Sequence, residues 1–255
     1  MSSISSVSGY GSYSPYSTIA AGGTYQSASQ GASELAIQEK TESQIGGLDA
    51  GSENLTSAKS VLNIEDGALD GITDYLQSIR ELSLQAMNGT LSDDDKQAIQ
   101  DQIEQYKQGI EDIAGNTTYN EKNLLNGSTD DMKVATDNNG SETTVSTYNS
   151  TLEALGIADY DVTGDFDLSA IDDALDMVTS SRSNAGAQTN GVEYALSYNS
   201  HAALELNGYQ MDKEEDNAIK AYQQLKTQQA LDSYQMTLQN KQMEDKEKQN
   251  LMLFT

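Results

Sequence analysis

The sequence predicts a mainly α-helical protein: a long antiparallel helical bundle, or coiled-coil-like rod, with one small β-hairpin. Three observations lead to this fold class. The chain has a single proline, Pro15, so little along its length would break a helix. A seven-residue apolar repeat runs from Leu55 to Ala86. Two short β-like runs near residues 130–150 flank a turn sequence, Asp-Asn-Asn-Gly.

The composition favours narrow helical packing over a compact core. The hydrophobic fraction is 36%, below the roughly 45–50% that is usual for globular proteins when glycine is included. The chain has no tryptophan and only two phenylalanines. We therefore expect thin apolar stripes on long helices.

The seven-residue repeat predicts the first long helix. Its seam positions fall into two sets, and eight of the ten are apolar, as expected for coiled-coil-like contact with a partner helix. The first set is Leu55, Leu62, Leu69, Leu76 and the polar Ser83, and the second is Ala58, the polar Glu65, Ile72, Ile79 and Ala86. Asn88-Gly89 tolerates positive φ and should end the helix. Gly67 and Gly71 weaken its middle and indicate a bend or a close helix approach.

A second helix is predicted from Ser92, whose hydroxyl can cap free amides next to three aspartates. Its apolar stripe is Ile99, Ile103, Tyr106, Ile110 and Ile113. The runs 132–136 and 143–148, joined by residues 137–140, predict the hairpin. Helical periodicity returns at Ser169, which we expect to form a capping pair with Asp172.

The domain organisation follows from these patterns. Residues 1–32 are rich in Ser, Gly and Tyr and nearly uncharged, so we predict a flexible segment. Residues 33–212 form the predicted helical core, with the hairpin near 130–150. Residues 213–255, with apolar positions in a Gln- and Lys-rich background, form a predicted C-terminal helix.

The charge excludes several classes of partner. Forty acidic and fourteen basic residues give a formal charge of −26, which repels nucleic acid and anionic membrane surfaces. No apolar run approaches the roughly 20 residues that span a bilayer. Met1–Thr18 lacks the basic and apolar regions of a signal peptide. If the protein is exported, we expect a route without a cleaved signal.

No catalytic residue, cofactor site or metal site is predicted. His201 is the single histidine, and no G-x-S-x-G turn accompanies it. Asp93-Asp94-Asp95 is better explained by helix capping, and Asp159 to Asp165 by a turn, than by calcium binding. Six N-x-[ST] sequons are most simply turn and cap residues. They begin at Asn54, Asn88, Asn116, Asn126, Asn139 and Asn149.

One segment resembles a known family. Residues 76–90, LQSIRELSLQAMNGT, resemble the bacterial flagellin signature LQ-x-[IV]-REL-[SA]-[VL]-QA-x-NGT. Residues 116–120, NTTYN, and 124–127, LLNG, follow in the order of that family's pattern. Residues 28–40, 171–187 and, more weakly, 249–254 are similar to other flagellin stretches. The resemblance covers residues 20 to 190 well.

The resemblance implies the flagellin core: paired amino- and carboxy-terminal helices with a hairpin, without the outer variable domains. It implies a structural, non-enzymatic subunit of the bacterial flagellar filament, or a minor co-assembling flagellin-like protein, secreted to the flagellum. Implied partners are other flagellin subunits, a flagellar export chaperone and a flagellin-sensing innate receptor. Two alternatives stay open: a secreted, non-polymerising binding or antigenic module, and a hook–filament junction protein.

The resemblance also implies a subunit or receptor interface on the face that carries the REL motif. Its residues are Gln77, Ser78, Arg80, Glu81, Leu82, Leu84, Gln85, Asn88, Gln102 and Ile103. Leu82 and Leu84 lie off the main seam and would be left for a neighbouring subunit. Ser78 stands where flagellins often have a basic residue, and Gln102 where they usually have Glu. We therefore expect weak receptor binding. The family's first helix is replaced here by Met1–Thr18, so filament formation by this chain alone is an open question.

Overall fold

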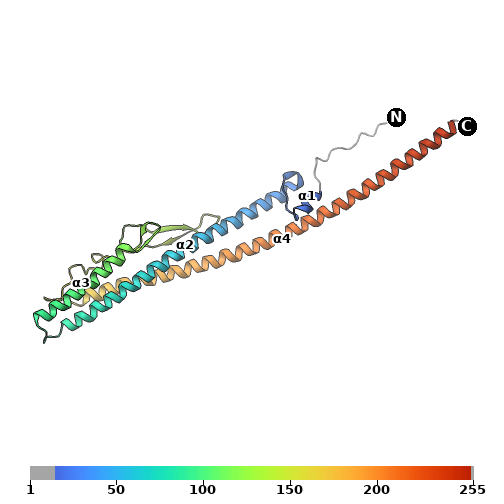
Figure 1. The fold of residues 1–255 in the computed structure, drawn as a ribbon. Helices are drawn as coiled ribbons and strands as arrows, with labels where there is room; N and C mark the ends of the chain where they lie inside the picture. The colour runs from blue at the N-terminus through green and yellow to red at the C-terminus, as the bar shows by residue number, and fades with distance from the viewer. Residues whose placement is uncertain (1–14, 254–255) are drawn as a thin grey trace. The chain divides into compact units, whose positions relative to one another are not determined.

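The computed structural model describes residues 15–253, which form four helices and two two-stranded antiparallel sheets (Figure 1). In chain order these are α1 (Pro15–Ala20), α2 (Ala28–Ala86), α3 (Asp93–Asn116), β1 (Thr118–Tyr119), β2 (Lys122–Asn123), β3 (Met132–Ala135), β4 (Glu142–Val145) and α4 (Ser169–Leu253). The predicted fold class, mainly α with a small hairpin, is confirmed.

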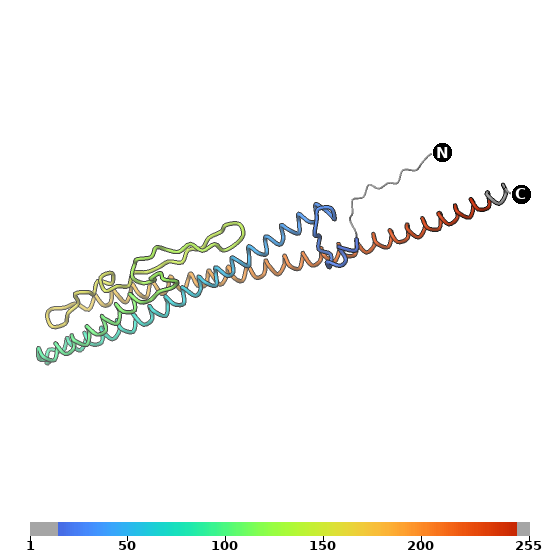
Figure 2. Tube along the Cα trace, turned by 45° about the horizontal axis from the view of Figure 1, so that its top comes forward, coloured from blue at the N-terminus to red at the C-terminus, as the bar shows by residue number. Residues whose placement is uncertain are grey.

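The chain divides into two compact units. Unit 1 comprises the residues up to Ile45 and from Ala203 onward, and unit 2 comprises Gly46–Ala202. This differs from the predicted division at residues 32 and 212. Helix α4 passes through residue 212 without a break, and residues 28–45 of α2 group with the C-terminal part of α4 (Figure 2). This grouping depends on contacts between segments that are distant in sequence, and composition cannot predict such contacts.

In unit 2, α2 and α4 run antiparallel, as three groups of ion pairs demonstrate. Lys59 pairs with Glu193 at 2.7 Å, and Arg182 pairs with Asp66 and Asp70 at 3.1 and 2.7 Å. Farther along, Arg80 pairs with Asp172 at 2.7 Å. The residue number rises along α2 as it falls along α4, so the two helices point in opposite directions.

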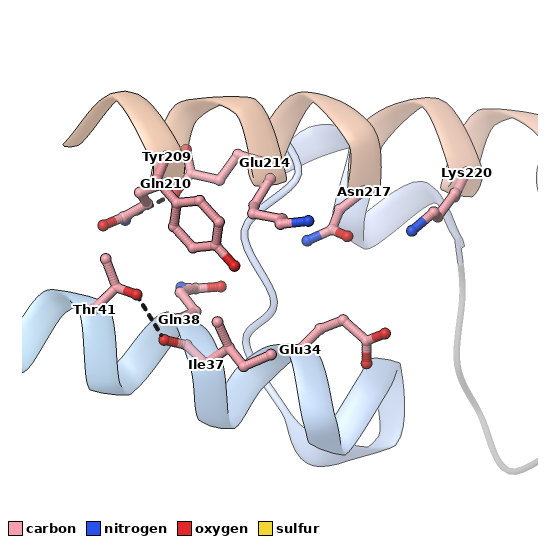
Figure 3. Close-up of a pocket in the computed structure, with 10 residues that line it drawn as sticks. Glu34, Ile37, Gln38, Thr41, Tyr209, Gln210, Glu214, Asn217 and Lys220 are labelled. Carbon is pink, nitrogen blue, oxygen red and sulfur yellow. Dashed lines mark hydrogen bonds between the residues drawn. The ribbon is translucent and has the colours of Figure 1, made fainter. Parts of the chain in front are cut away.

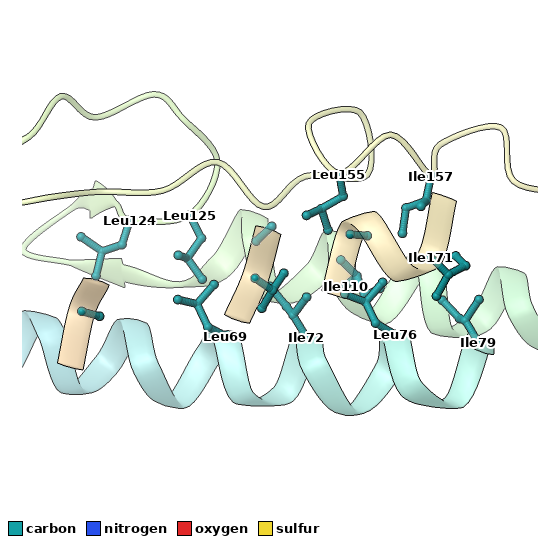
Figure 4. Close-up of a cluster of buried hydrophobic side chains, with 14 of the residues drawn as sticks. Leu69, Ile72, Leu76, Ile79, Ile110, Leu124, Leu125, Leu155, Ile157 and Ile171 are labelled. Carbon is teal, nitrogen blue, oxygen red and sulfur yellow. The ribbon is translucent and has the colours of Figure 1, made fainter. Parts of the chain in front are cut away.

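The seven-residue seam of α2 is the core of unit 2. All ten predicted seam positions are buried, including the polar Glu65 and Ser83. Leu69, Ile72, Leu76 and Ile79 face apolar side chains of α3, the loops and α4 (Figure 4). The opposing residues include Ile110, Leu124, Leu125, Leu155, Ile157 and Ile171. The prediction of one continuous helix over residues 55–86 is therefore confirmed.

Helix α3 packs beside α2 with the cap that the sequence predicts. Ser92 Oγ accepts the amide of Asp95, and Asp95 Oδ2 accepts the amide of Ser92 at 3.0 Å, which completes a capping box. Gly71 marks a close approach, because a β-carbon there would lie 3.1 Å from Ile113 Cδ1. At Gly67 a β-carbon would meet nothing within 4 Å. Of the two glycines, only Gly71 lies against a side chain of another helix.

Two buried polar side chains of α3 hold the loop that leads toward α4. Gln100 Nε2 donates to the carbonyl of Tyr160 at 3.2 Å, and the amide of Val162 donates to Gln100 Oε1 at 2.9 Å. Lys107 Nζ, on an almost fully buried side chain, also donates to the Tyr160 carbonyl, at 3.4 Å. The loop backbone therefore finds partners inside the subunit.

The predicted hairpin is present. β3 pairs with β4 in the register Met132↔Val145 to Ala135↔Glu142. Its turn contains Gly140 at φ +82°, and Asp137 Oδ1 accepts the amides of Asn139 and Ser141. A second, smaller hairpin of β1 and β2 was not predicted. Asn120 and Glu121 both have positive φ at its turn, a geometry that Asn supports but that Glu seldom adopts.

One predicted detail is wrong. α4 begins at Ser169, as expected, but Ser169 does not pair with Asp172, because its amide and hydroxyl both donate to the carboxylate of Asp167. Asp172, the expected capping partner, instead accepts from Arg80 Nε. Asp167 precedes Ser169 by two residues, which suits a side chain to backbone turn.

The segment predicted to be flexible is partly helical. α1 occupies residues 15–20, and α2 begins at Ala28 with a kink at Gly31. Pro15 suits the first position of a helix, and Gly23, at φ +97°, lies so close to α4 within unit 1 that a β-carbon would overlap the carbonyl of Glu214. Residues 1–14, the rest of the predicted segment, lie outside the described residues.

Candidate assembly surface

The predicted interface residues on the REL face of α2 lie mostly at the surface of unit 2. Gln77, Glu81 and Gln85 are exposed, and Ser78 and Arg80 are half-buried. Arg80 donates to Asp172 of α4, and this contact raises the pKa of the guanidinium. Arg80 is thus positioned by an intramolecular ion pair, with 42% of its side chain still exposed.

Two of the predicted interface residues are not available to a neighbour. Leu82 is 9% exposed and Ile103 is fully buried, and both belong to the core of unit 2. Position 82 lies off the α2 seam that the repeat defines, so the sequence pattern alone assigned it to the surface. Leu84 is 47% exposed and Met87 60%, so this face retains an apolar part.

The remaining predicted residues are exposed at the end of α2 and on α3. Asn88 Oδ1 accepts the amide and the hydroxyl of Thr90 and closes the turn after α2. Gln102 donates to the hydroxyl of Tyr106 at 3.3 Å. Eight of the ten predicted residues therefore lie wholly or partly at the surface. Their role in binding stays a prediction.

A second apolar surface lies on α4 in unit 1, mostly along the C-terminal helix that was predicted for residues 213–255. Many large apolar side chains are exposed along this part of the helix, and so many exposed on one helix is unusual. They are Leu204, Tyr209, Met211, Ile219, Tyr222, Leu231, Tyr234, Met236, Leu238 and Met243. The stripe of Ile219, Tyr222, Leu231, Tyr234 and Leu238 is visible in the sequence, but only the structure shows that nothing covers it within the described residues.

The seam of unit 1 is polar where that of unit 2 is apolar. Thr41 of α2 and Asn217 of α4 are buried, and they line a cavity of about 160 Å³ with Glu34, Ile37, Gln38 and Tyr209 (Figure 3). Thr41 Oγ1 donates to the carbonyl of Ile37, so its hydroxyl is already bonded within α2. Unit 1 therefore has little apolar interior of its own.

The residues that were considered for catalysis or metal binding lie at the surface, in a helix cap or in a turn. His201 is exposed on α4. Asp95 belongs to the capping box, and its hydrogen bonds from Ser92 lower the pKa of its carboxyl. Asp161 accepts the amide and the hydroxyl of Thr163 in a turn. Within residues 15–253, no group of three His, Cys, Asp or Glu side chains is arranged to hold a metal ion.

Three of the six sequons form the turns that were predicted for them. Asn88, Asn126 and Asn149 each accept the amide and the hydroxyl of the Ser or Thr two residues later. Asn54 differs, because its side-chain amide donates to the carbonyl of Ala135.

Among the described helices, none is long and apolar enough to cross a membrane.

Comparisons with known proteins agree with this architecture. Residues 15–130 match the family described as the bacterial flagellin N-terminal helical region. The flagellin of Halalkalibacterium halodurans is 32% identical over 173 residues, which cover 65% of this chain and 63% of that protein. Phase 1 flagellin of Salmonella naestved is 35% identical over 54% of this chain and 27% of its own length. The chain thus spans less than two thirds of either relative.

Solved structures show the same fold. A Bacillus cereus flagellin superposes with a TM-score of 0.50 at 24% identity, covering 58% of this chain and 88% of that one. A Vibrio parahaemolyticus protein described as flagellar hook-associated superposes with a TM-score of 0.62 at 18% identity, covering 73% of this chain and all of the other. The matched helical region and the sequence relatives show that this chain is similar to bacterial flagellins, and the solved structures share its fold.

Proposed function

We propose that this protein is a structural subunit of the bacterial flagellar filament, or a minor flagellin-like subunit that co-assembles with conventional flagellin. Flagellins are structural proteins, and we propose no enzymatic activity for this chain. The observation that carries the proposal is the exposed apolar stretch of α4 in unit 1, which includes Leu231, Tyr234 and Leu238. Burying such side chains against another subunit contributes about 25 cal/mol per Å² of apolar surface.

The surface on unit 2 supports a second contact of the same kind. Leu84 and Met87 supply exposed apolar area, and Gln77, Glu81 and Gln85 supply polar groups around it. Interfaces between proteins commonly combine an apolar centre with a polar rim. We propose that this face packs against a neighbouring subunit, with Leu82 and Ile103 supporting it from inside.

Because the chain carries a formal charge of −26, its assembly should depend on the salt concentration. Like-charged subunits repel one another, and the Debye length shortens from about 30 Å at 0.01 M to about 8 Å at 0.15 M ionic strength. Assembly through apolar stripes should therefore strengthen as salt is added. An interface held by ion pairs would weaken instead.

Sedimentation of the purified protein, alone and mixed with a conventional flagellin, tests the proposal. We expect pelleting at physiological salt, in at least the mixture, and less pelleting at 0.01 M salt. Pelleting only in the mixture would identify a co-assembling subunit. A folded helical protein that stays soluble in both conditions would refute the filament role.

A matched pair of variants locates the contact. Leu231→Ser removes an exposed apolar side chain of α4, and Gln229→Ser alters a nearby exposed polar one. We expect Leu231→Ser to reduce pelleting several-fold while circular dichroism stays unchanged. Gln229→Ser should pellet as the parent does. Equal behaviour of the two variants would contradict burial of Leu231 between subunits.

The hook–filament junction is the second candidate, favoured by the superposition on the hook-associated protein. A junction protein would bind flagellin in small, fixed proportion without extending a filament. A non-polymerising secreted module would bind no flagellin at all. The stoichiometry in the mixed pellet therefore distinguishes the three roles.

The remaining partners follow from the same proposal. We propose export to the cell exterior without a cleaved signal, with a flagellar chaperone bound to the exposed part of α4 before assembly. We propose weak binding to the flagellin-sensing innate receptor, because Ser78 and Gln102 replace charged residues on the REL face. Signalling equal to that of an ordinary flagellin would refute this last point.

A further inference from the structure

Glu65 occupies a seam position of α2 that should be apolar. Its side chain is fully buried, and neither carboxylate oxygen has a hydrogen-bond partner among the described residues. The seam positions one helical turn before and after it hold the buried Leu62 and Leu69. A buried carboxylate without donors is costly, whereas a protonated carboxyl is tolerated much better. The site therefore favours the neutral form.

Both ends of the hairpin come together near this carboxyl. Asp131 immediately precedes β3, and its Oδ1 accepts the amide of Thr147, beyond β4, at 3.1 Å. The amide of Tyr148 donates to the carbonyl of Leu124 at 3.1 Å. The hydroxyl of Tyr148 is itself buried without a partner. We call residues 129–131 and 146–149 the hairpin base; two of its residues, Asp131 and Tyr148, lie close enough to Glu65 for charge to act between them.

The charges around Glu65 do not neutralise it. Burial and then the negative charge of Asp131 raise the pKa of Glu65 to about 8. Burial, followed by the charges of Glu65 and Asp131, raises the pKa of Tyr148 to about 12.

Within the described residues, helix α4 brings no unpaired cation to this level of α2. On α4, Arg182 is bonded to Asp66 and Asp70 of α2. Gln188 of α4 is neutral and accepts the amide of Ser146 at 3.0 Å. The hairpin base is thus hydrogen-bonded to α4 through Gln188.

We propose that Glu65 acts as a proton-operated latch: when protonated it lets the hairpin base close on α2, and loss of its proton releases the hairpin base. In the open form water reaches the carboxyl, and its pKa falls back toward 4.5. Between pH of about 4.5 and about 8 the closed form holds a proton that the open form lacks. Each unit of rising pH in this window favours opening by up to about tenfold. Above the window both forms are ionised and the effect levels off.

Hydrogen exchange of the hairpin base tests the latch. Rates at residues 144–149 are compared between the parent chain and Glu65→Gln at the same pH, so that intrinsic exchange cancels. We expect the ratio of parent to variant rates to climb steadily from pH 5 to 8 and then flatten. A ratio that stays constant with pH, or that falls, would overturn the proposal.

Two further variants make the test specific. Glu53→Gln changes an exposed carboxyl on the same helix and should leave the rise with pH intact. Asp131→Asn removes the like charge, so the rise should level off at a lower pH. If Glu65→Gln does not fold, a carboxyl-carbon NMR titration of the parent decides the matter. A Glu65 resonance titrating near pH 4.5 refutes the latch, and one near 8 supports it.

Discussion

Unit 2 and unit 1 share helices α2 and α4 but bury very different side chains. The seam of unit 2 holds Leu55, Leu62, Leu69 and Leu76 in full burial. In unit 1, the buried residues of α2 and α4 are Thr41, Asn217 and Ala221, and twelve of the large exposed apolar residues lie there against six in unit 2. The apolar seam of unit 2 is buried by contacts within the unit. In unit 1, much of the apolar surface of α4 stays exposed within the described residues and is available to a partner.

Truncating a leucine in each unit gives the largest expected contrast. Leu69→Ala should lower the free energy of unfolding by about 2–5 kcal/mol, because it opens a cavity in a packed core. Leu204→Ala, at a side chain 69% exposed, should change it by less than about 0.5 kcal/mol. Urea unfolding followed by circular dichroism measures both. Comparable losses would mean that α4 in unit 1 is as well packed as the core of unit 2.

The glycine turn of unit 1 provides the next test. Gly23→Ala places a residue with a β-carbon at φ +97°, which costs about 1–3 kcal/mol, and adds an overlap with the carbonyl of Glu214. Gly22→Ala is the matched control, because its φ is also positive but nothing lies within 4 Å of the added carbon. We expect faster proteolysis of residues 15–27 in Gly23→Ala than in Gly22→Ala. Identical rates would show that the close approach to α4 does not hold this segment.

The capping box of α3 should matter less than the seam. Ser92→Ala removes the acceptor for the Asp95 amide and should lower the free energy of unfolding of unit 2 by about 1 kcal/mol. Ser57→Ala is a suitable control, since its hydroxyl bonds only to the carbonyl of Glu53 within the same helix. Thermal unfolding monitored by circular dichroism compares the two. A loss as large as that of Leu69→Ala would contradict a surface cap.

The smallest effect is expected at the Arg80–Asp172 pair. Both side chains are exposed, at 42% and 50%, so solvent and salt screen their attraction. Asp172→Asn should lower the free energy of unfolding only slightly, and by still less in high salt. A double-mutant cycle with Arg80→Gln isolates the coupling. Coupling that persists undiminished in 1 M salt would mean that the pair is shielded from solvent.

The same contrast explains how much the sequence could predict. The repeat in α2 predicts its own buried face, because burial recurs every seven residues, and even Glu65 and Ser83 were recognised as exceptions within it. Ser92 and the turn at residues 137–140 are local signals, and both were interpreted correctly. These features depend on residues close together in the chain.

Other features depend on residues far apart, and the sequence could not supply them. Leu82 was assigned to the surface, and Ile103 to an interface although it also belongs to the predicted apolar stripe of α3; both lie in the core of unit 2. Gly23 matters because the backbone of Glu214, nearly two hundred residues later, lies against it. The grouping of residues 15–45 with the end of α4 has the same origin.

The buried side chain of Gln100 holds the loop that leads toward α4 through main-chain atoms of that loop. Its side-chain nitrogen donates a hydrogen bond to the carbonyl of Tyr160, and its side-chain oxygen accepts one from the amide of Val162. A carboxylate at this position would repel the carbonyl, so Gln100→Glu is not a neutral exchange. Because only main-chain atoms are recognised, the identity of the loop's outward side chains is irrelevant to this anchor. Related proteins could therefore diversify that loop while keeping its path.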